Sequence, residues 1–348
     1  MTIIRWVFDF GLLELLSILF VLANFLTFFL YIADKRKAEK NKWRISERTL
    51  IFFTLAFDGV GALAGMRFAR HKTQKTKFRI AATVGLVIVL IFAVHIAYGF
   101  TLGRVVRYFE VSFYSESWPP ELNGYRIAFI ADKHLITEEE MREVVAELNE
   151  RDLDLLILGG DFHMGNAHYQ GTIRQLAQTI TTDGIFGVEG NHDDYVRLFV
   201  AKRQYGIIPL DNDGLKIREG FFLAGVHDMW NRTPSIEEAT VKAGVSDFIL
   251  LVTHNPDVTM EQRTENIDLI LAAHTHGGQI TFFGLPLYLL LGNITQHGMR
   301  FSHGYAYSAD GVPVFTTNGV SSGGVVYDVP RVFARPEVVI FTMYSMAN

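Results

Sequence analysis

The chain has 348 residues, enough for one large domain and a smaller one. Its formal net charge of −5 argues against a general nucleic-acid-binding protein, which would usually be basic, so we expect no nucleic-acid partner. The chain contains no cysteine, which excludes disulfides and thiolate metal sites. Hydrophobic residues make up 49% of it, a high share for a soluble enzyme, and the excess lies in the first hundred residues.

Two long apolar segments lie in this N-terminal third, from Leu12 to Ile32 and from Ile80 to Leu102. About 20 apolar residues suffice to cross a bilayer as a helix, so we predict that both segments span a membrane. A cleaved signal peptide is the alternative for the first segment. That segment is long, however, lacks a small-x-small cleavage site and ends in the charged residues 34–37. We therefore assign residues 1–104 to a transmembrane region of two to three helices.

The segment between them, Thr49–Phe68, admits two interpretations. It is apolar, but it contains Asp58 and the glycines Gly59, Gly61 and Gly65. An aspartate at membrane depth usually faces a bundle interior or a polar cavity. A helix end near the interface would explain the same residue without any such role.

Basic residues flank this middle segment on both sides, with seven Lys or Arg in residues 35–48 and six in residues 67–79. Positively charged short loops favour the cytoplasm, but three full spans would place these two loops on opposite sides of the membrane. A re-entrant or interfacial middle segment lets both loops lie in the cytoplasm. The C-terminal domain then lies on the extracytoplasmic face, the arrangement that we favour. The basic loops would also attract the headgroups of anionic membrane lipids.

Residues 25–80 contain a recognisable pattern, formed by Asp34, Lys35, Ala38, Trp43, Arg44, Ile45, Glu47, Thr49, Leu50, Gly65, Met66, Arg70, His71, Lys72, Thr73, Lys75 and Phe78. It resembles that of a family of small bacterial membrane proteins of unknown function. The resemblance implies a membrane location and nothing about chemistry. Together with the predicted spans, it leads us to expect a multi-pass protein of the cell membrane.

The C-terminal two-thirds is predicted to be an α/β domain over residues 125–348, preceded by a linker and lead-in strand over residues 105–124. Helices are expected at Thr137–Leu148, where Thr137 and Glu140 are placed for a capping box, at Gly171–Ile180 and from Asp193 onward. The expected strands are Tyr125–Ala131, Leu153–Leu158, Ile185–Glu189, Phe221–Val226, Phe248–Thr253, Ile267–Ala272, Val312–Thr316 and Val338–Met343. Alternation of strands and helices early, with more strands late, predicts a sandwich of mixed β-sheets flanked by helices.

Five of these strands end in side chains that can bind a metal. The side chains are Asp132 and His134, Asp161, Asn191 with His192 and Asp193, His254, and finally His274 and His276. Ligands of open α/β sheets gather outside the carboxyl ends of the strands. A single buried histidine or turn aspartate is usually structural, but the ordered series together indicates a metal centre.

Hydrolysis with two metal ions explains the residue types. Two divalent ions held about 4 Å apart can share a bridging carboxylate and a bridging hydroxide. The bridging group must be anionic with two available oxygens, and Asp161 fits this requirement. Mixed nitrogen and oxygen ligands favour Mn, Fe, Zn, Ni or Co over Ca or Mg, without selecting among the five.

The order D-x-H, G-D, G-N-H-D, H and H-x-H over residues 120–345 resembles that of the calcineurin-like metallophosphoesterases. The resemblance implies that metal one is bound by Asp132, His134, Asp161 and His276. It implies that metal two is bound by Asp161, Asn191, His254 and His274. His192 corresponds to the family histidine that contacts the phosphate and can protonate or stabilise the leaving oxygen. Asp193 is a candidate for orienting His192, with a helix N-cap as the alternative.

Finer features, at residues 254–257, 274–279 and 330–337, resemble the membrane-anchored branch that includes relatives of UDP-2,3-diacylglucosamine pyrophosphatase. Two residues depart from the family pattern. Ala273 stands where glycine is usual, and Lys133 where an apolar residue is common. We expect modest crowding from Ala273. For Lys133 we favour a solvent-facing strand end over a role in attracting an anionic substrate.

These features predict a membrane-anchored phosphoesterase, a phosphodiesterase or pyrophosphatase, in which a dimetal-bridging hydroxide attacks the phosphorus. The anchor favours a lipid-linked phosphoester as substrate. The alternative is a non-catalytic metal-binding sensor or transport-associated module in the membrane. The intact His192 weighs against that alternative, because a module without catalysis would not need it.

Overall fold

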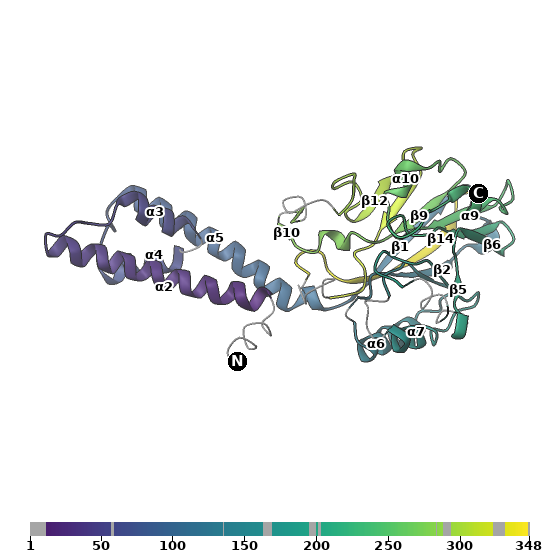
Figure 1. Ribbon diagram of the computed structural model, residues 1–348, viewed down its shortest axis with the longest axis horizontal. Coiled ribbons are helices and arrows are strands. Elements are labelled where there is room, and N and C mark those ends of the chain that lie inside the picture. Colours follow the sequence, from purple (N-terminus) through teal and green to yellow (C-terminus); the bar gives the residue numbers. More distant parts are fainter. Residues whose placement is uncertain are drawn as a thin grey trace. The chain divides into compact units, whose positions relative to one another are not determined.

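The computed structural model describes residues 12–56, 59–134, 136–162, 169–194, 200, 203–282, 284–287, 294–322 and 331–346. The chain divides into two compact units, Met1–Thr101 and Leu102–Asn348. We call them the N-terminal unit and the C-terminal unit. The first is built of helices and the second contains the sheets (Figure 1).

The N-terminal unit contains two long helices, α2 (Leu12–Glu39) and α5 (Thr76–Phe100). Within the described residues, these two helices are long and apolar enough to cross a membrane. The middle segment forms two short helices instead of one, α3 (Glu47–Leu55) and α4 (Gly59–Phe68). A helix of 9 or 10 residues is about 15 Å long, half the thickness of the hydrocarbon core, so neither one crosses it alone. Asp58 lies outside the described residues.

Glycines let the short helices pack closely against the long ones. A Cβ atom on Gly61 of α4 would lie 2.1 Å from the carbonyl oxygen of Asn24 in α2. A Cβ atom on Gly85 of α5 would lie 2.2 Å from the carbonyl oxygen of Thr54 in α3. Small residues allow such close contact between helix backbones. The Asn24 Oδ1 also accepts a hydrogen bond from Gly61 N at 2.8 Å, which pairs an amide in the unsatisfied first turn of α4.

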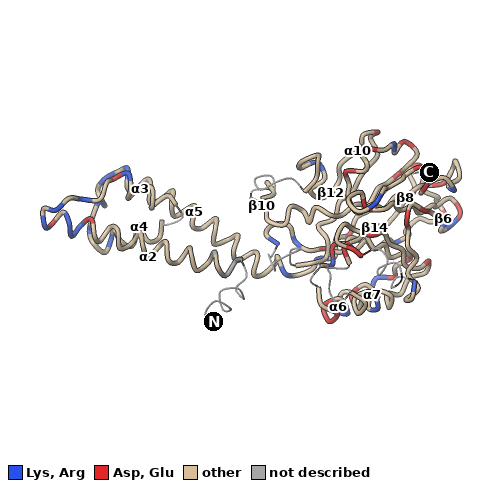
Figure 2. Tube along the Cα trace, viewed as in Figure 1, with Lys and Arg blue, Asp and Glu red and all other residues tan. Residues whose placement is uncertain are grey.

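A buried ion cluster joins the two basic loops of this unit. Asp34, fully buried near the end of α2, accepts hydrogen bonds from Arg44 Nη2 at 2.9 Å and from Ile45 N at 3.0 Å. Its Oδ2 also lies 2.7 Å from His71 Nε2 and 3.5 Å from Lys72 Nζ, both in the loop after α4. Lys and Arg gather at this end of the N-terminal unit in Figure 2. Both basic loops therefore lie at the end where α2 finishes and α5 begins.

The C-terminal unit contains two six-stranded sheets. The first has the order β1-β14-β2-β3-β4-β5, in which β2 to β5 are parallel and β14 runs antiparallel to β2. Its strands are β1 (Arg107–Ser115), β2 (Tyr125–Ile130), β3 (Leu155–Leu158), β4 (Ile185–Gly187), β5 (Ile208–Pro209) and β14 (Glu337–Ser345).

The second sheet has the order β12-β13-β9-β8-β7-β6, parallel from β13 to β7 and antiparallel at both edges. Its strands are β6 (Asp213–Arg218), β7 (Phe221–Gly225), β8 (Phe248–Val252), β9 (Leu269–Ala272), β12 (Gly304–Tyr307) and β13 (Pro313–Thr316). A small hairpin pairs β10 (Thr281–Phe282) with β11 (Leu285–Pro286). Three single 3-10 turns lie at Leu102–Arg104, Pro120–Leu122 and His276–Gly278.

Successive side chains of a strand point to opposite faces of its sheet, and this alternation produces the layers. Tyr125, Ile127 and Phe129 of β2 point into the core between the two sheets, whereas Ala128 and Ile130 point to the opposite face. Two helices, α6 (Glu138–Asn149) and α7 (Tyr169–Leu176), cover that face (Figure 1). The short helix α9 (Ile236–Thr240) covers the outer face of the second sheet, and α10 (Val258–Glu261) follows β8. The predicted sandwich of mixed sheets with flanking helices is confirmed.

The predicted elements agree with the structure apart from their ends. The capping box at the start of α6 is present, with Thr137 Oγ1 accepting from Glu140 N at 3.2 Å and Glu140 Oε2 accepting from Thr137 N at 2.8 Å. The helix α7 begins two residues before the predicted start and ends at Leu176, four residues before the predicted end. The helix predicted from Asp193 onward falls largely outside the described residues.

Candidate metal centre

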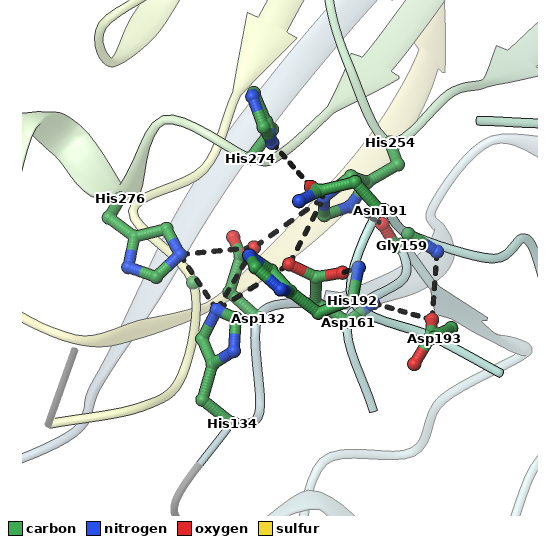
Figure 3. Close-up of polar contacts among 12 residues, drawn as sticks. Asp132, His134, Gly159, Asp161, Asn191, His192, Asp193, His254, His274 and His276 are labelled. Carbon is green, nitrogen blue, oxygen red and sulfur yellow. Dashed lines mark hydrogen bonds and ion pairs between the residues drawn. The ribbon is translucent and has the colours of Figure 1, made fainter. Parts of the chain in front are cut away.

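The predicted ligands come from loops that follow five strands of the two sheets. Asp132 and His134 follow β2, Asp161 follows β3, Asn191 follows β4, His254 follows β8, and His274 and His276 follow β9. The strands β2, β3 and β4 are parallel, as are β8 and β9, so their carboxyl ends lie at common edges. Figure 3 shows that the seven side chains point toward one another.

One group of ligand atoms surrounds Asp132. Its Oδ1 lies 3.4 Å from His276 Nε2, and His276 Nε2 lies 2.8 Å from His134 Nε2. His134 Nε2 is also 3.6 Å from Asp161 Oδ2. These four residues offer one atom each within 4.8 Å of one another, and all four are buried. This is the set expected for metal one.

A second group surrounds the side-chain oxygen of Asn191. This oxygen lies 3.1 Å from His254 Nε2 and 2.8 Å from His274 Nδ1. His254 Nε2 is 3.3 Å from Asp161 Oδ2, the oxygen that also faces His134. Asp161 therefore lies between the two groups, where a bridging carboxylate would have to be.

The buried polar atoms of the centre fit divalent cations. Asp132 is fully buried, yet neither of its carboxylate oxygens has a hydrogen-bond partner among the described residues. Burying an ionised carboxylate without a partner is costly, and a bound cation removes that cost. Imidazole nitrogens together with carboxylate and amide oxygens are the mixed donors that transition metals accept.

Among the described residues, three of the four candidate imidazole ligands have a contact on the ring nitrogen that faces away from the ligand groups. The Nδ1 of His254 lies 2.8 Å from the carbonyl oxygen of Gly159, and the Nδ1 of His276 lies 3.1 Å from Gln279 Oε1. The Nε2 of His274 lies 3.3 Å from the carbonyl oxygen of Ile294. Such contacts fix the tautomer and the ring orientation of histidine ligands, leaving the remaining nitrogen to face the metal.

The charges of the centre shift the pKa values of its members. Burial alone would raise the pKa of Asp132, but the neighbouring imidazoles outweigh burial and hold it at about 2. Burial, reinforced by adjacent imidazoles, lowers the pKa of His134 and of His274 to about 3, so both rings are neutral and able to bind a cation. Burial would also lower the pKa of His254, but the Asp161 carboxylate overrides it and raises the pKa well above its usual value.

The backbone at these ligands is unusual. Five of the seven have a positive φ: Asp132 at 52°, His134 at 38°, Asp161 at 60°, His274 at 73° and His276 at 53°. This left-handed region disfavours residues with a side chain by about 1–3 kcal/mol each, and it is maintained only where the surroundings impose it. Backbone bonds such as Asp132 N to Gly160 O, at 3.0 Å, hold the loops in this form.

Two glycines give these loops the room they need. A Cβ atom on Gly190 would lie 2.2 Å from Asp161 Oδ1, and one on Gly319 would lie 2.5 Å from Asp132 Cβ. Both distances are far below van der Waals contact. Any side chain at either position would therefore displace a predicted ligand.

His192 and Asp193 adjoin the centre but differ in their surroundings. His192 is exposed, with its ring centroid 5.7 Å from that of His134, and its backbone amide donates to Asp161 Oδ1 at 2.9 Å. The Asp193 carboxylate accepts hydrogen bonds from the amides of Asp161, Phe162 and Gly190, each at 2.8 Å. Asp193 thus fixes the two loops that carry Asp161 and Asn191. Its action on His192 stays a prediction, and an N-cap role would involve residues outside those described.

Lys133 is not at a solvent-facing strand end, so that prediction is wrong. The residue is only 3% exposed, and burial lowers the pKa of its amino group to about 8. Its backbone amide donates to the carbonyl oxygen of Asp161 at 3.0 Å, which places the residue inside the paired ligand loops.

The loop after β7 also contributes residues beside the centre, and no sequence motif predicted this. The ring of Trp230 packs edge-on against His274 with centroids 4.7 Å apart, although Trp230 is 55% exposed. Asn231 Nδ2 donates to the carbonyl oxygen of Asn191 at 2.7 Å. Fully buried Asp228 accepts from the amide of Trp230 at 2.9 Å. These residues form the wall beside the Asn191 group.

Comparisons with known proteins bear on both units. The sequence model of the family described as calcineurin-like phosphoesterase matches residues 125–278, and that of a family described as protein of unknown function (DUF1294) matches residues 24–78. The uncharacterized metallophosphoesterase YkuE of Bacillus subtilis is 27% identical over 65% of this chain and 82% of its own length. The uncharacterized metallophosphoesterase Cj0846 of Campylobacter jejuni is 25% identical over 84% of this chain and 78% of its own. A Danio rerio relative, named transmembrane protein with metallophosphoesterase domain, is 25% identical over 72% of this chain and 64% of its own.

Proposed function

Because the chain belongs to the calcineurin-like metallophosphoesterases and carries a DUF1294 segment before that domain, we propose that it is a membrane-anchored phosphoesterase with a dinuclear metal centre. The reaction would be hydrolysis of a phosphodiester or a pyrophosphate.

One observation carries the proposal: the position of Asp161. Its Oδ2 lies 3.6 Å from His134 in one ligand group and 3.3 Å from His254 in the other. A carboxylate between two sets of metal-binding donors is what two cations would share. The two carboxylate oxygens of Asp132, which have no hydrogen-bond partner within the described part of the chain, support a cation in the first group.

Bound divalent cations would supply Lewis acidity toward the phosphoryl oxygens and lower the pKa of a coordinated water. The chain itself binds and orients. Asn191 contributes a neutral oxygen, and the lowered pKa values of His134 and His274 keep those rings uncharged. His192, exposed beside His134, is placed to hold a proton near the leaving oxygen of a bound phosphoester.

The N-terminal unit supports an orientation in the membrane. Asp34 binds residues of both basic loops, so the two loops share one end of the helical unit. By the rule that basic loops face the cytoplasm, that end is cytoplasmic. The 25 residues of α5 span about 37 Å, so its C-terminal end would lie at the opposite membrane surface. The C-terminal unit would then be extracytoplasmic.

The short connection between the units supports a substrate in the membrane. Only residues 101–106 separate the end of α5 at Phe100 from the start of β1 at Arg107. An extended connection of this length spans at most about 20 Å. The catalytic unit would therefore stay near the bilayer surface, which favours a lipid-linked phosphoester.

The test is hydrolysis by the full chain, purified in detergent, stripped of metal and resupplied with Mn, Zn, Fe, Ni or Co. We expect turnover of a chromogenic phosphodiester only after metal is restored. Asp161→Ala should reduce turnover at least a thousandfold, a loss of about 4 kcal/mol of transition-state stabilisation. The control Glu265→Ala removes a carboxylate from an exposed position and should behave like the wild type. Unchanged turnover in Asp161→Ala would exclude this mechanism.

A metal-binding sensor or transport-associated module is the second candidate. It would bind metal equally well, yet show no turnover on a panel of lipid phosphoesters, nucleotides and chromogenic diesters. The exposed His192 beside the ligand groups favours the enzyme over the sensor.

A further inference from the structure

The segment that enters the last strand contains a completely buried arginine. Arg331 has an exposed fraction of 0% and donates through Nε to the carbonyl oxygen of Ser321 at 2.8 Å. Its Nη1 donates to the carbonyl oxygen of His276 at 2.5 Å. Its Nη2 has no hydrogen-bond partner among the described residues. This guanidinium therefore contacts the backbone of a predicted metal ligand directly.

The other carbonyl that Arg331 binds leads to a second predicted ligand. The amide of Ser321 donates to the carbonyl oxygen of Asp132 at 3.1 Å. Arg331 thus links the loop carrying His276 to the loop carrying Asp132. The next residue in the chain, Val332, contacts the same loop. Its amide donates to the carbonyl oxygen of Gln279 at 3.0 Å, and Gln279 Oε1 lies 3.1 Å from His276 Nδ1.

The loop after β9 is held both by its own turns and from outside. His274, His276, Gly277, Gly278 and Gln279 all have a positive φ, so this stretch continues neither as an α-helix nor as a strand. The carbonyl oxygen of His276 accepts one hydrogen bond from Gln279 N within the loop, at 3.0 Å, and a second one from Arg331 outside it. A guanidinium presents several donors in a fixed plane and can bind two carbonyls at once, whereas the single ammonium of a lysine holds no such fork.

We propose that Arg331 is a positioning residue for metal one, which fixes the backbone of His276 so that its Nε2 faces Asp132 and His134. This inference rests on the proposed function and deepens it. The two sites should then respond differently to loss of Arg331. Asn191 and His254 of the second group are held by Asn231 and by the carbonyl oxygen of Gly159, which are independent of Arg331.

The test measures metal binding, independently of activity. Metal-free full-length protein in detergent is titrated with Co²⁺ and followed by absorption and calorimetry. For the wild type we expect two binding steps. Arg331→Met should weaken one step by about 10–100-fold, the range found when a group that orients a metal ligand is removed, and leave the other unchanged. Arg331→Lys should recover part of that loss.

The matched control is Arg335→Met. Arg335 lies in the same segment and also donates to a backbone carbonyl, that of Val105, but its side chain makes no hydrogen bond to a ligand loop among the described residues. It should retain both steps. Wild-type affinity at both steps in folded Arg331→Met would overturn the inference. If that variant does not fold, Arg331→Lys decides instead, and two unchanged steps in it would overturn the inference equally. A wild type that binds no Co²⁺ would contradict the proposed function as well.

Discussion

Asp34 Oδ2 and His71 Nε2 lie 2.7 Å apart, although 37 positions separate the two residues in the chain. Between them the chain forms the two short helices α3 and α4 and returns to the same end of the helical unit. A full third span would have carried His71 to the other end. In the proposed membrane orientation, this contact would hold both basic loops on the same side, in agreement with the charge rule.

This arrangement predicts the accessibility of single cysteines, which can be introduced cleanly because the chain has none. We expect Glu219→Cys in the C-terminal unit to react in intact cells with a thiol reagent that cannot cross the cell membrane. Lys42→Cys, in the first basic loop, should react only after the cells are broken. Both positions are exposed, so differences in burial do not confound the comparison. If only Lys42→Cys is labelled in intact cells, the orientation is the opposite of the one proposed.

His192→Asn should separate binding from chemistry. His192 belongs to neither ligand group, so we expect the variant to bind metal as the wild type does. Its kcat should fall by about 10²–10⁴ for a substrate with a poor leaving group such as an alkyl alcohol, which needs a proton. With p-nitrophenolate, which leaves without protonation, the fall should be much smaller. Equal losses for both leaving groups in steady-state assays would exclude proton donation as the role of His192.

Gly319→Ala should displace Asp132, since the added Cβ would lie 2.5 Å from Asp132 Cβ. Gly319 has a φ of 78°, so the change also strains the backbone. Gly311→Ala is the matched control, because Gly311 has a φ of 85° and no atom lies near its Cβ position. We expect both variants to lose thermal stability through backbone strain, Gly319→Ala the more because of the clash, but only Gly319→Ala to lose metal from the first group. Metal analysis after gel filtration distinguishes the two.

Glu337 should make the free energy of unfolding depend on pH in the acidic range. It is fully buried and its Oε2 accepts from Arg107 Nε at 2.8 Å, while its Oε1 lies 3.1 Å from His303 Nε2. Burial alone would raise the pKa of Glu337, but His303 and Arg107 outweigh it and lower the pKa to about 2. The stabilisation is therefore complete above the ordinary glutamate pKa, near 4.5, and is lost as the pH falls from there toward 2.

Glu337→Gln should abolish most of the pH dependence of stability that Glu337 causes. We expect it to cost roughly 2–3 kcal/mol at pH 7, allowing for screening around its partly exposed partners, and little at pH 2.5. Thermal unfolding at several pH values provides the measurement. A wild-type melting temperature that stays constant from pH 6 to pH 3, in parallel with the variant, would show that the buried pair contributes nothing.

Much of the fold could be predicted because a buried strand requires a simple pattern of apolar residues in the sequence. β2, β3, β8 and β9 are short apolar runs bounded by polar turns, and each was predicted to within two residues at its ends. The edge strands β6 and β12 gave no such signal. β6 and β12 expose every second or third residue, and their sequences Asp213–Arg218 and Gly304–Tyr307 include the glycines and charges that usually indicate loops.

The ligand residues could be placed together from the sequence because each one follows a strand, and parallel strands end at a common edge. The residues around them could not. Trp230 and Arg331 reach the centre through contacts with His274 and His276 that depend on how two distant loops fold over each other. Nothing in the local sequence of either residue specifies such a partner.

The left-handed backbone of five predicted ligands has a consequence for how the protein acquires its cations. These conformations are imposed by carbonyls, amides and close-packed glycines of the surrounding chain, so the cage takes its shape as the polypeptide folds. The donor atoms are then in position before an ion binds, so little of the binding free energy is needed to order them. Different transition-metal ions should accordingly enter and leave one unchanged scaffold, and the supply in the cell should decide which of them is bound.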